Sequence, residues 1–194
     1  MLRRNIRVAG FFSMIICAWF SLNAGSDENT YTGYLDSTTT SKTHSFTLQN
    51  DGEIRLTITY DSTLDLSSYF SNGLEIFCTN GTRIFSVNSP SSGINYGPFG
   101  IKSGTYYWKI NRISGTGNYT LKTIFNAQII ANDKEPNDTY SNAVIIKASD
   151  TAVGHLGYKG GNDGSVDEVD IYKTTIEGDG AFKINITYDS TLDL

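Results

Sequence analysis

The stretch Gly104-Thr105-Tyr106-Tyr107-Trp108-Lys109-Ile110-Asn111 decides the fold. Successive side chains of a β-strand point to opposite faces, so Tyr106, Trp108 and Ile110 share one face. The other face carries Tyr107, Lys109 and Asn111. An apolar face opposite a more polar one is typical of a strand with one side in a core. We therefore predict that Tyr106 and Trp108 are core residues rather than a platform for stacking sugars.

Similar stretches occur along the chain and are separated by turn-forming residues such as Asn80-Gly81. They are rich in Thr, Ile, Tyr and Phe, and we predict strands at 45–49, 54–60, 74–79, 83–88, 106–112 and 119–125. One short helix is predicted near 139–144, capped by Asp138 or Thr139. Many short strands joined by turns predict an all-β fold, an antiparallel β-sandwich.

The chain contains a tandem repeat. Residues 186–194 repeat residues 58–66, Ile-Thr-Tyr-Asp-Ser-Thr-Leu-Asp-Leu, letter for letter. We interpret 30–126 as one β-sandwich module and 127–194 as a linker with a truncated second copy. We predict strands at 171–176 and 181–188 in that copy. Upstream, Gly154-His155-Leu156 matches Gly33-Tyr34-Leu35 at a smaller offset, so the second copy carries an insertion near 160–166.

Residues 1–24 have the pattern of a secretory signal peptide, with a basic start and an uncharged apolar run. A transmembrane anchor is the alternative, but the run is shorter than the roughly 20 residues that span a bilayer. We therefore expect a secreted, extracellular protein without stable membrane insertion. The formal net charge of −5 disfavours nucleic acid as a partner. Outside this segment the only cysteine is Cys78, which we expect to be buried as a small apolar side chain.

Several motifs follow one another in a recognisable order. The second copy has Glu135-Pro136-Asn137-Asp138, then Gly154-His155-Leu156, then Asp167-Glu168-Val169-Asp170-Ile171-Tyr172, and the first copy has Gly104-Thr105-Tyr106-Tyr107 and Gly117-Asn118-Tyr119-Thr120-Leu121. This order resembles the bacterial pre-peptidase C-terminal domain, or PPC domain. The resemblance implies a jelly-roll sandwich that serves as an accessory module behind secreted peptidases and other exported enzymes. Collagenase relatives of that family bind collagen and calcium.

The resemblance also implies a calcium site in the second copy. By position, the residues that match the calcium-binding relatives are Glu135, Asn137, Asp138, Asp167 and Asp170, and Asn162 could supply a loop oxygen. Calcium takes six to eight oxygen ligands, which this set can offer. The first copy has Thr39 and Lys42 where the second has Asp167 and Asp170, so we expect Ca²⁺ in the second module only. The alternative is a solvated acidic loop without an ion.

We expect no enzymatic activity and no catalytic residues. The zinc motif H-E-x-x-H and the nucleophile motif G-x-S-x-G are both absent from the sequence. His44 and His155 are expected to be structural, with a His155–Asp163 dyad as the alternative. The expected function is a secreted, non-catalytic accessory or binding module of a larger extracellular protein such as a peptidase. A carbohydrate-binding or adhesin-type sandwich is the alternative, so the ligand would be an extracellular protein or a polysaccharide.

Overall fold

The computed structural model describes residues 26–130, 133–179, 181 and 183–188. The predicted signal peptide at 1–24 and the repeated end at 189–194 lie outside these residues. The described part of the chain contains strands and turns but no helix, so the predicted all-β class is confirmed. Accordingly, it contains no helix with the length and apolar character needed to cross a membrane.

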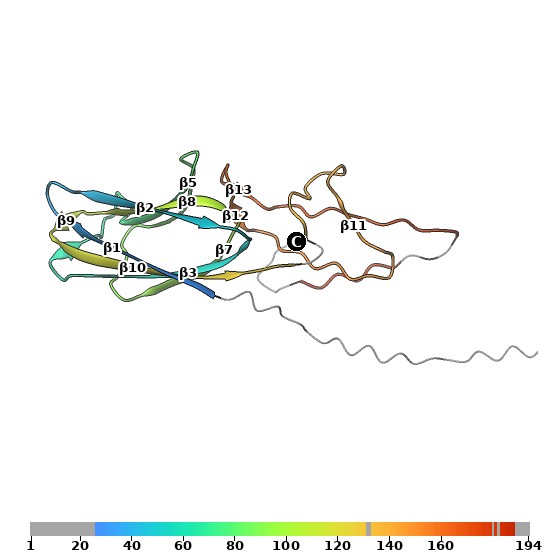
Figure 1. The fold of residues 1–194 in the computed structure, drawn as a ribbon, viewed down its shortest axis with the longest axis horizontal. Helices are drawn as coiled ribbons and strands as arrows, with labels where there is room; N and C mark the ends of the chain where they lie inside the picture. Colours follow the sequence, from blue (N-terminus) through green and yellow to red (C-terminus); the bar gives the residue numbers. More distant parts are fainter. Residues whose placement is uncertain (1–25, 131–132, 180, 182, 189–194) are drawn as a thin grey trace, which may run out of the picture.

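Two β-sheets face each other (Figure 1). The six-stranded sheet contains, in spatial order, β1 (Ser26–Leu35), β10 (Gly117–Ala127), β3 (Gly52–Tyr60), β7 (Asn95–Ile101), β12 (Lys159–Gly160) and β13 (Ser165–Val166). The four-stranded sheet contains β2 (Ser41–Leu48), β8 (Gly104–Asn111), β5 (Leu74–Cys78) and β6 (Arg83–Val87). Two small pairs join β4 (Leu64–Asp65) to β9 (Ser114–Gly115) and β11 (Val144–Ile145) to β14 (Tyr172–Lys173).

The first module is an antiparallel sandwich with the strand order of a jelly roll. Its sheets run β1-β10-β3-β7 and β2-β8-β5-β6, and every pairing within these two sets is antiparallel. The chain crosses from one sheet to the other at most connections, as in jelly rolls built from two Greek keys. The strands span Ser26 to Ala127, slightly beyond the predicted limits of 30–126.

The core lies between these two sheets and has the predicted composition. The side chains of Tyr106, Trp108 and Ile110 are fully buried on the inner face of β8. Phe46 of β2 stacks on Trp108, with ring centroids 5.2 Å apart. Cys78 is also buried, as expected. The alternation of apolar and polar residues in β8 therefore reports the position of the core correctly.

Some predicted elements are wrong. Residues 139–144 form a turn rather than a helix, with Asn142 N donating to Thr139 O at 3.0 Å. This segment is largely exposed and has no apolar face to pack, so nothing offsets the cost of starting a helix. The sequence patterns also missed β1 and β7. Strand β7 contains Gly97-Pro98, and its pairing with β3 shifts register between Ile54 and Leu56, so its pattern is irregular.

The insertion in the second copy packs against the first module. It forms the β12–β13 hairpin, and β12 runs parallel to β7, with Lys102 N donating to Lys159 O at 2.9 Å. The hydroxyl of Tyr106 accepts a hydrogen bond from Gly161 N at 2.7 Å and donates to Lys102 O at 2.6 Å. The ring of Tyr158 fills the space where a Cβ at position 100 would lie. The hairpin thus extends the sheet of the first module by two strands.

In the rest of the second copy, the described residues form little β-structure. Its predicted strand at 171–176 is reduced to Tyr172–Lys173, and the described residues within 181–188 form no strand. Ile184 and Ile186 are 67% and 72% exposed. A strand is stable when neighbouring strands pair with it and cover its apolar face, and the described residues provide neither for this segment.

Candidate metal centre

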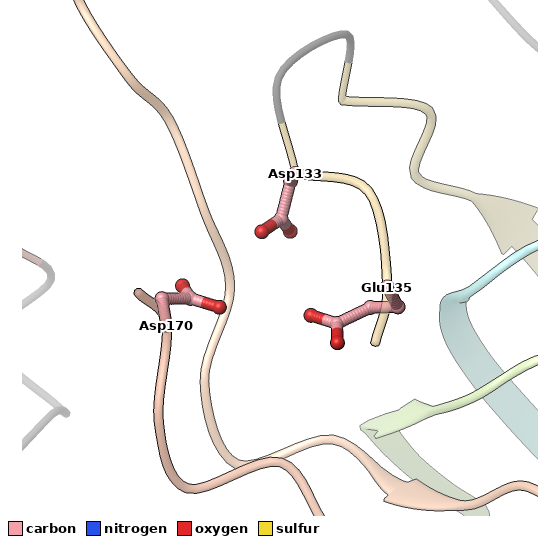
Figure 2. Close-up of side chains that lie close together, drawn as sticks. All are labelled: Asp133, Glu135 and Asp170. Carbon is pink, nitrogen blue, oxygen red and sulfur yellow. The ribbon is translucent and has the colours of Figure 1, made fainter. Parts of the chain in front are cut away.

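Five carboxylates of the second copy converge where the linker meets the segment between β13 and β14. Oxygen atoms of Asp133, Glu135 and Asp170 lie within 4.8 Å of one another, and so do those of Glu135, Asp138 and Asp167. Figure 2 shows the first of these groups, with the three carboxyl groups pointing toward a common space. Since Glu135 belongs to both groups, the five residues form one acidic cluster.

Asp133 and Asp167 of the cluster are buried, Glu135 and Asp170 are half-buried, and Asp138 is exposed. Several oxygen atoms of the cluster are nevertheless buried without a hydrogen-bond partner. Asn137 is fully buried and Asp167 is 1% exposed. The unpartnered buried oxygens among the described residues include Glu135 Oε1, Asn137 Oδ1, Asp167 Oδ1, Asp167 Oδ2 and Asp170 Oδ1. Buried polar oxygens are nearly always satisfied in folded proteins, and an unpaired buried charge is costly. These atoms therefore form a donor set that a bound cation would satisfy.

The electrostatics of the cluster also favour a positive charge. Burial, reinforced by the negative charge of Asp167, raises the pKa of Glu135 to about 7. Burial raises the pKa of Asp167 to about 6 against the opposing charge of Lys102, and it also raises the pKa of Asp170. Carboxyl groups placed together out of water hold protons more tightly because their ionised forms repel one another. A cation among them would reverse that preference.

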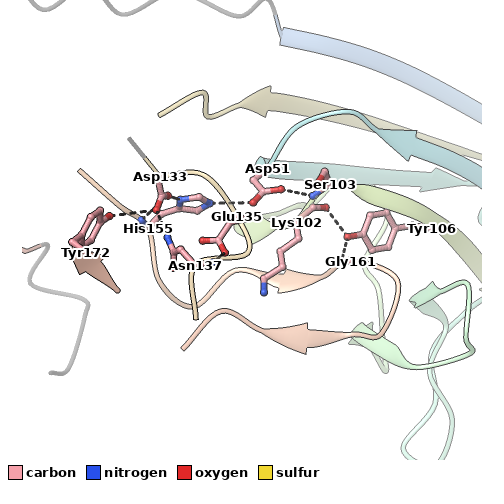
Figure 3. Close-up of polar contacts among 10 residues, drawn as sticks. All are labelled: Asp51, Lys102, Ser103, Tyr106, Asp133, Glu135, Asn137, His155, Gly161 and Tyr172. Atoms are coloured by element: carbon pink, nitrogen blue, oxygen red, sulfur yellow. Dashed lines mark hydrogen bonds and ion pairs between the residues drawn. The ribbon is translucent and has the colours of Figure 1, made fainter. Parts of the chain in front are cut away.

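Asp133 connects the cluster to the first module through His155. Its carboxylate contacts His155 Nδ1 and accepts a hydrogen bond from His155 N at 3.2 Å. On its other side, His155 Nε2 lies 3.5 Å from Asp51 Oδ2, in the turn between β2 and β3 of the first module. Burial alone would lower the pKa of His155, but the two carboxylates outweigh it and raise this pKa to about 9. Figure 3 shows this line of contacts from Tyr172 to Asp51.

The contacts of His155 replace the predicted dyad. The imidazole pairs with Asp133 and Asp51, whereas Asp163 Oδ1 accepts a hydrogen bond from Ser165 N at 2.9 Å in the hairpin turn. The dyad with Asp163 is therefore wrong. His155 is held between two carboxylates of the protein and bridges the two modules.

Most of the residues singled out from the sequence do meet in space. Glu135, Asp138, Asp167 and Asp170 lie in the cluster. Asn137 lies among them, since its Nδ2 donates to Asp133 Oδ1 at 3.3 Å and its backbone N donates to Glu135 Oε2 at 3.1 Å.

One residue of the predicted set lies outside the cluster, and one residue of the cluster was not predicted. Asn162 is exposed in the turn between β12 and β13, within the hairpin that packs on the first module. Asp133 is not in the predicted set, and the structure places it in the cluster. Its position depends on His155, which comes from a distant part of the chain, so the motif spacing carried no signal for it.

The donor chemistry fits calcium better than a transition metal. All donors in the cluster are carboxylate or amide oxygens, the ligands that Ca²⁺ prefers. Zinc and copper favour imidazole and thiolate ligands, whereas His155 is engaged by two carboxylates and Cys78 lies in the core of the first module. At the equivalent positions the first copy has Thr39 and Lys42, and a lysine ammonium repels a cation.

No family model matches the chain, and no curated protein matches it either.

Proposed function

We propose that this chain is a non-catalytic binding or accessory module of a larger exported protein, and that its second copy binds calcium through Asp133, Glu135, Asn137, Asp138, Asp167 and Asp170. The observation that carries this proposal is the set of unpartnered buried oxygens in the cluster. The signal-like start and the order of the PPC-like motifs support the exported, accessory role.

The role of the ion follows from the elements that it would join. Asp133, Glu135 and Asp138 come from the linker, whereas Asp167 and Asp170 lie between β13 and β14. An ion bound to both segments fixes the linker onto the second copy. Because Asp133 also holds His155, which reaches Asp51, the same ion stiffens the junction with the first module. The module would then present its surfaces in a fixed orientation to the rest of the parent protein.

Calcium binding to the full chain can be measured by calorimetric titration together with thermal unfolding. A ligand that binds only the folded state at a hundredfold excess over its Kd stabilises that state by about 2.7 kcal/mol. Asp167→Asn should strongly weaken binding and the thermal shift. Without calcium, the same variant should be more stable than the wild type, because it removes a buried, unpaired charge.

Asp163→Asn is the matched control. Asp163 lies in the same acidic stretch but is exposed, and its side chain bonds only within the hairpin turn. This variant should bind calcium like the wild type. The absence of binding to the wild type, or equal binding by the Asp167→Asn protein, would overturn the calcium site.

A further inference from the structure

A second polar surface lies on the first module, over the outer face of the four-stranded sheet. It contains an open groove of about 460 Å³ that runs over β8 and the neighbouring ends of β2 and β5. The residues lining it that matter here are Asn72, Glu75, Lys109, Asn111 and Arg112. This groove shares no residue with the acidic cluster of the second copy.

The floor of the groove is preorganised by hydrogen bonds around Glu75, which is only 7% exposed. Its Oε1 accepts from Arg83 at 3.0 Å and from Asn72 Nδ2 at 3.1 Å, and its Oε2 accepts from Asn111 Nδ2 at 2.9 Å. The ion pair with Arg83 neutralises Glu75. The other charged residues that line the groove are Lys109 and Arg112, so its lining is positive on an acidic chain. The Nε of Arg112 donates to Gly115 O and its charge also interacts with Asp36, which leaves its terminal nitrogens for a ligand.

Two exposed aromatic residues come directly before the groove residues in the chain. Tyr69 and Phe70 immediately precede the groove residues Ser71 and Asn72, and they are 96% and 101% exposed. Backbone N atoms of Phe70 and Ser71 both donate to Ser68 Oγ at 3.1 Å, which holds the segment in a turn. Adjacent aromatic rings this exposed are unfavourable in water, and such apolar surface often marks a binding site. Their flat faces suit the C–H face of a sugar ring.

The sheet geometry favours a saccharide over a peptide. Strand β8 is paired on one side with β2 and on the other with β5, so its backbone is fully engaged in the sheet. A peptide that binds by adding a strand needs a free edge, which the centre of this sheet does not offer. Recognition here must use side chains, and the groove offers hydroxyl, amide, ammonium and guanidinium groups. These groups match sugar hydroxyls and a carboxylate.

We propose that this groove binds an acidic polysaccharide, whose uronate carboxylates pair with Lys109 and Arg112 while its rings stack on Tyr69 and Phe70. The proposal rests on the proposed function as a binding module and names its ligand class. It does not depend on calcium, because the groove and the acidic cluster are separate.

Affinity electrophoresis of the full chain in gels containing polygalacturonate or hyaluronan tests the proposal. The buffer contains EDTA, so the calcium site plays no part and calcium cannot cross-link the polymers. Dextran serves as the neutral saccharide and poly-glutamate as the polyanion without sugar rings. We expect retardation by the two uronate polymers, but not by dextran or poly-glutamate. The double variant Tyr69→Ala/Phe70→Ala should lose about tenfold in affinity, as expected for one or two aromatic contacts.

Control variants distinguish binding at the groove from the loss of any surface charge or any exposed aromatic ring. Lys109→Gln should weaken binding, whereas Lys122→Gln should not, since Lys122 lies on β10 of the other sheet and pairs with Glu28. Tyr140→Ala removes an aromatic that is 87% exposed in the second copy and should leave binding unchanged. If neither uronate polymer retards the chain, the proposal is overturned. Equal retardation by poly-glutamate, or unchanged binding by the Tyr69→Ala/Phe70→Ala protein, would also overturn it and reveal a polyanion surface only.

Discussion

The same nine residues occur twice in this chain, and where the structure describes both copies their surroundings differ. In the first copy Ile58 lies on β3, between β10 and β7, and is fully buried. In the second copy Ile186 occupies the same place in the repeat and is 72% exposed. Identical local sequence therefore does not determine burial. Ile58 is buried because β10 and β7 pair with its strand and the opposite sheet covers it.

The two copies also differ in their polar residues. The first copy has a closed apolar core and carries Thr39 and Lys42 where the second has Asp167 and Asp170. The described residues of the second copy have little apolar packing of their own, but four other carboxylates gather around Glu135. The first module is thus held by its core. The second depends on polar contacts with its neighbour and, in our proposal, on an ion.

The largest expected difference between the copies is their resistance to protease. Residues 26–127 form a complete sandwich, whereas the described residues within 181–188 are exposed and unpaired. Trypsin should cut the full chain rapidly after Lys183, while the first module survives much longer, because cleavage requires local unfolding. Mass spectrometry of a digestion time course would identify the surviving fragment. Equal survival of both regions would contradict the comparison.

Matched substitutions within the repeat should show the next largest effect. Ile58→Ala should cost about 2–5 kcal/mol of the unfolding free energy of the first module, the usual range for a buried Ile or Leu truncated to Ala. Ile186→Ala should change it by less than about 0.5 kcal/mol, as exposed substitutions do. Urea denaturation of the full chain, followed by tryptophan fluorescence, would measure both. Similar losses for the two variants would show that the second copy is also packed.

A pair of glycines tests the contact between the copies. Gly164 and Gly161 both lie in the hairpin turn with positive φ, at 77° and 68°. A Cβ at Gly164 would overlap Thr82 of the first module, whereas at Gly161 it would meet nothing nearer than Asp163 Oδ1 at 3.8 Å.

Gly164→Ala should therefore loosen the junction, and Gly161→Ala should share only the backbone strain of about 1 kcal/mol. The rate of tryptic cleavage after Lys134, an exposed residue of the linker, reports the difference. Faster cleavage in the Gly161→Ala protein than in the Gly164→Ala protein would contradict the observed docking.

The smallest expected effect is a pH dependence specific to the first copy. His44 is half-buried beside Tyr31, and its Nε2 lies 2.6 Å from the Tyr119 hydroxyl. Burial, helped by the charge of Lys42, lowers its pKa. The folded state therefore binds fewer protons than the unfolded state, whose histidine pKa is about 6.5, so stability falls as the pH drops through that value.

The second copy has Tyr172 at the position equivalent to His44. A His44→Tyr variant should therefore lose this dependence. Thermal unfolding of residues 26–130 between pH 8 and pH 5.5 would show it. A wild-type unfolding temperature that does not change with pH would contradict the assignment. So would a His44→Tyr variant whose unfolding temperature still falls as the pH drops.

The sequence predicted the core of the first module and most of the acidic cluster, and physical reasons explain what it missed. Tyr106, Trp108 and Ile110 were found because alternation in a strand is a local property. Asp138 and Asp170 were found through short motifs. The partnership of Asp133 with His155 and Asp51 was missed because it depends on how the β12–β13 hairpin packs on the first module, which no local pattern encodes. The described residues within 181–188 form no strand for the same reason, since the pairing of such a strand depends on distant residues.

Amide hydrogen exchange of the full chain with and without calcium tests the central claim most directly. We predict slower exchange at the amides that hold the cluster together, such as Ile171 N, which bonds to Asn137 O at 3.2 Å, and Gly157 N, which bonds to Asp167 O at 2.6 Å. Exchange within β3, β8 and β10 should not change, and Asp167→Asn should abolish the slowing. Exchange that calcium leaves unchanged around Asp167, or slows equally in the Asp167→Asn protein, would contradict the assignment of a calcium site to the second copy.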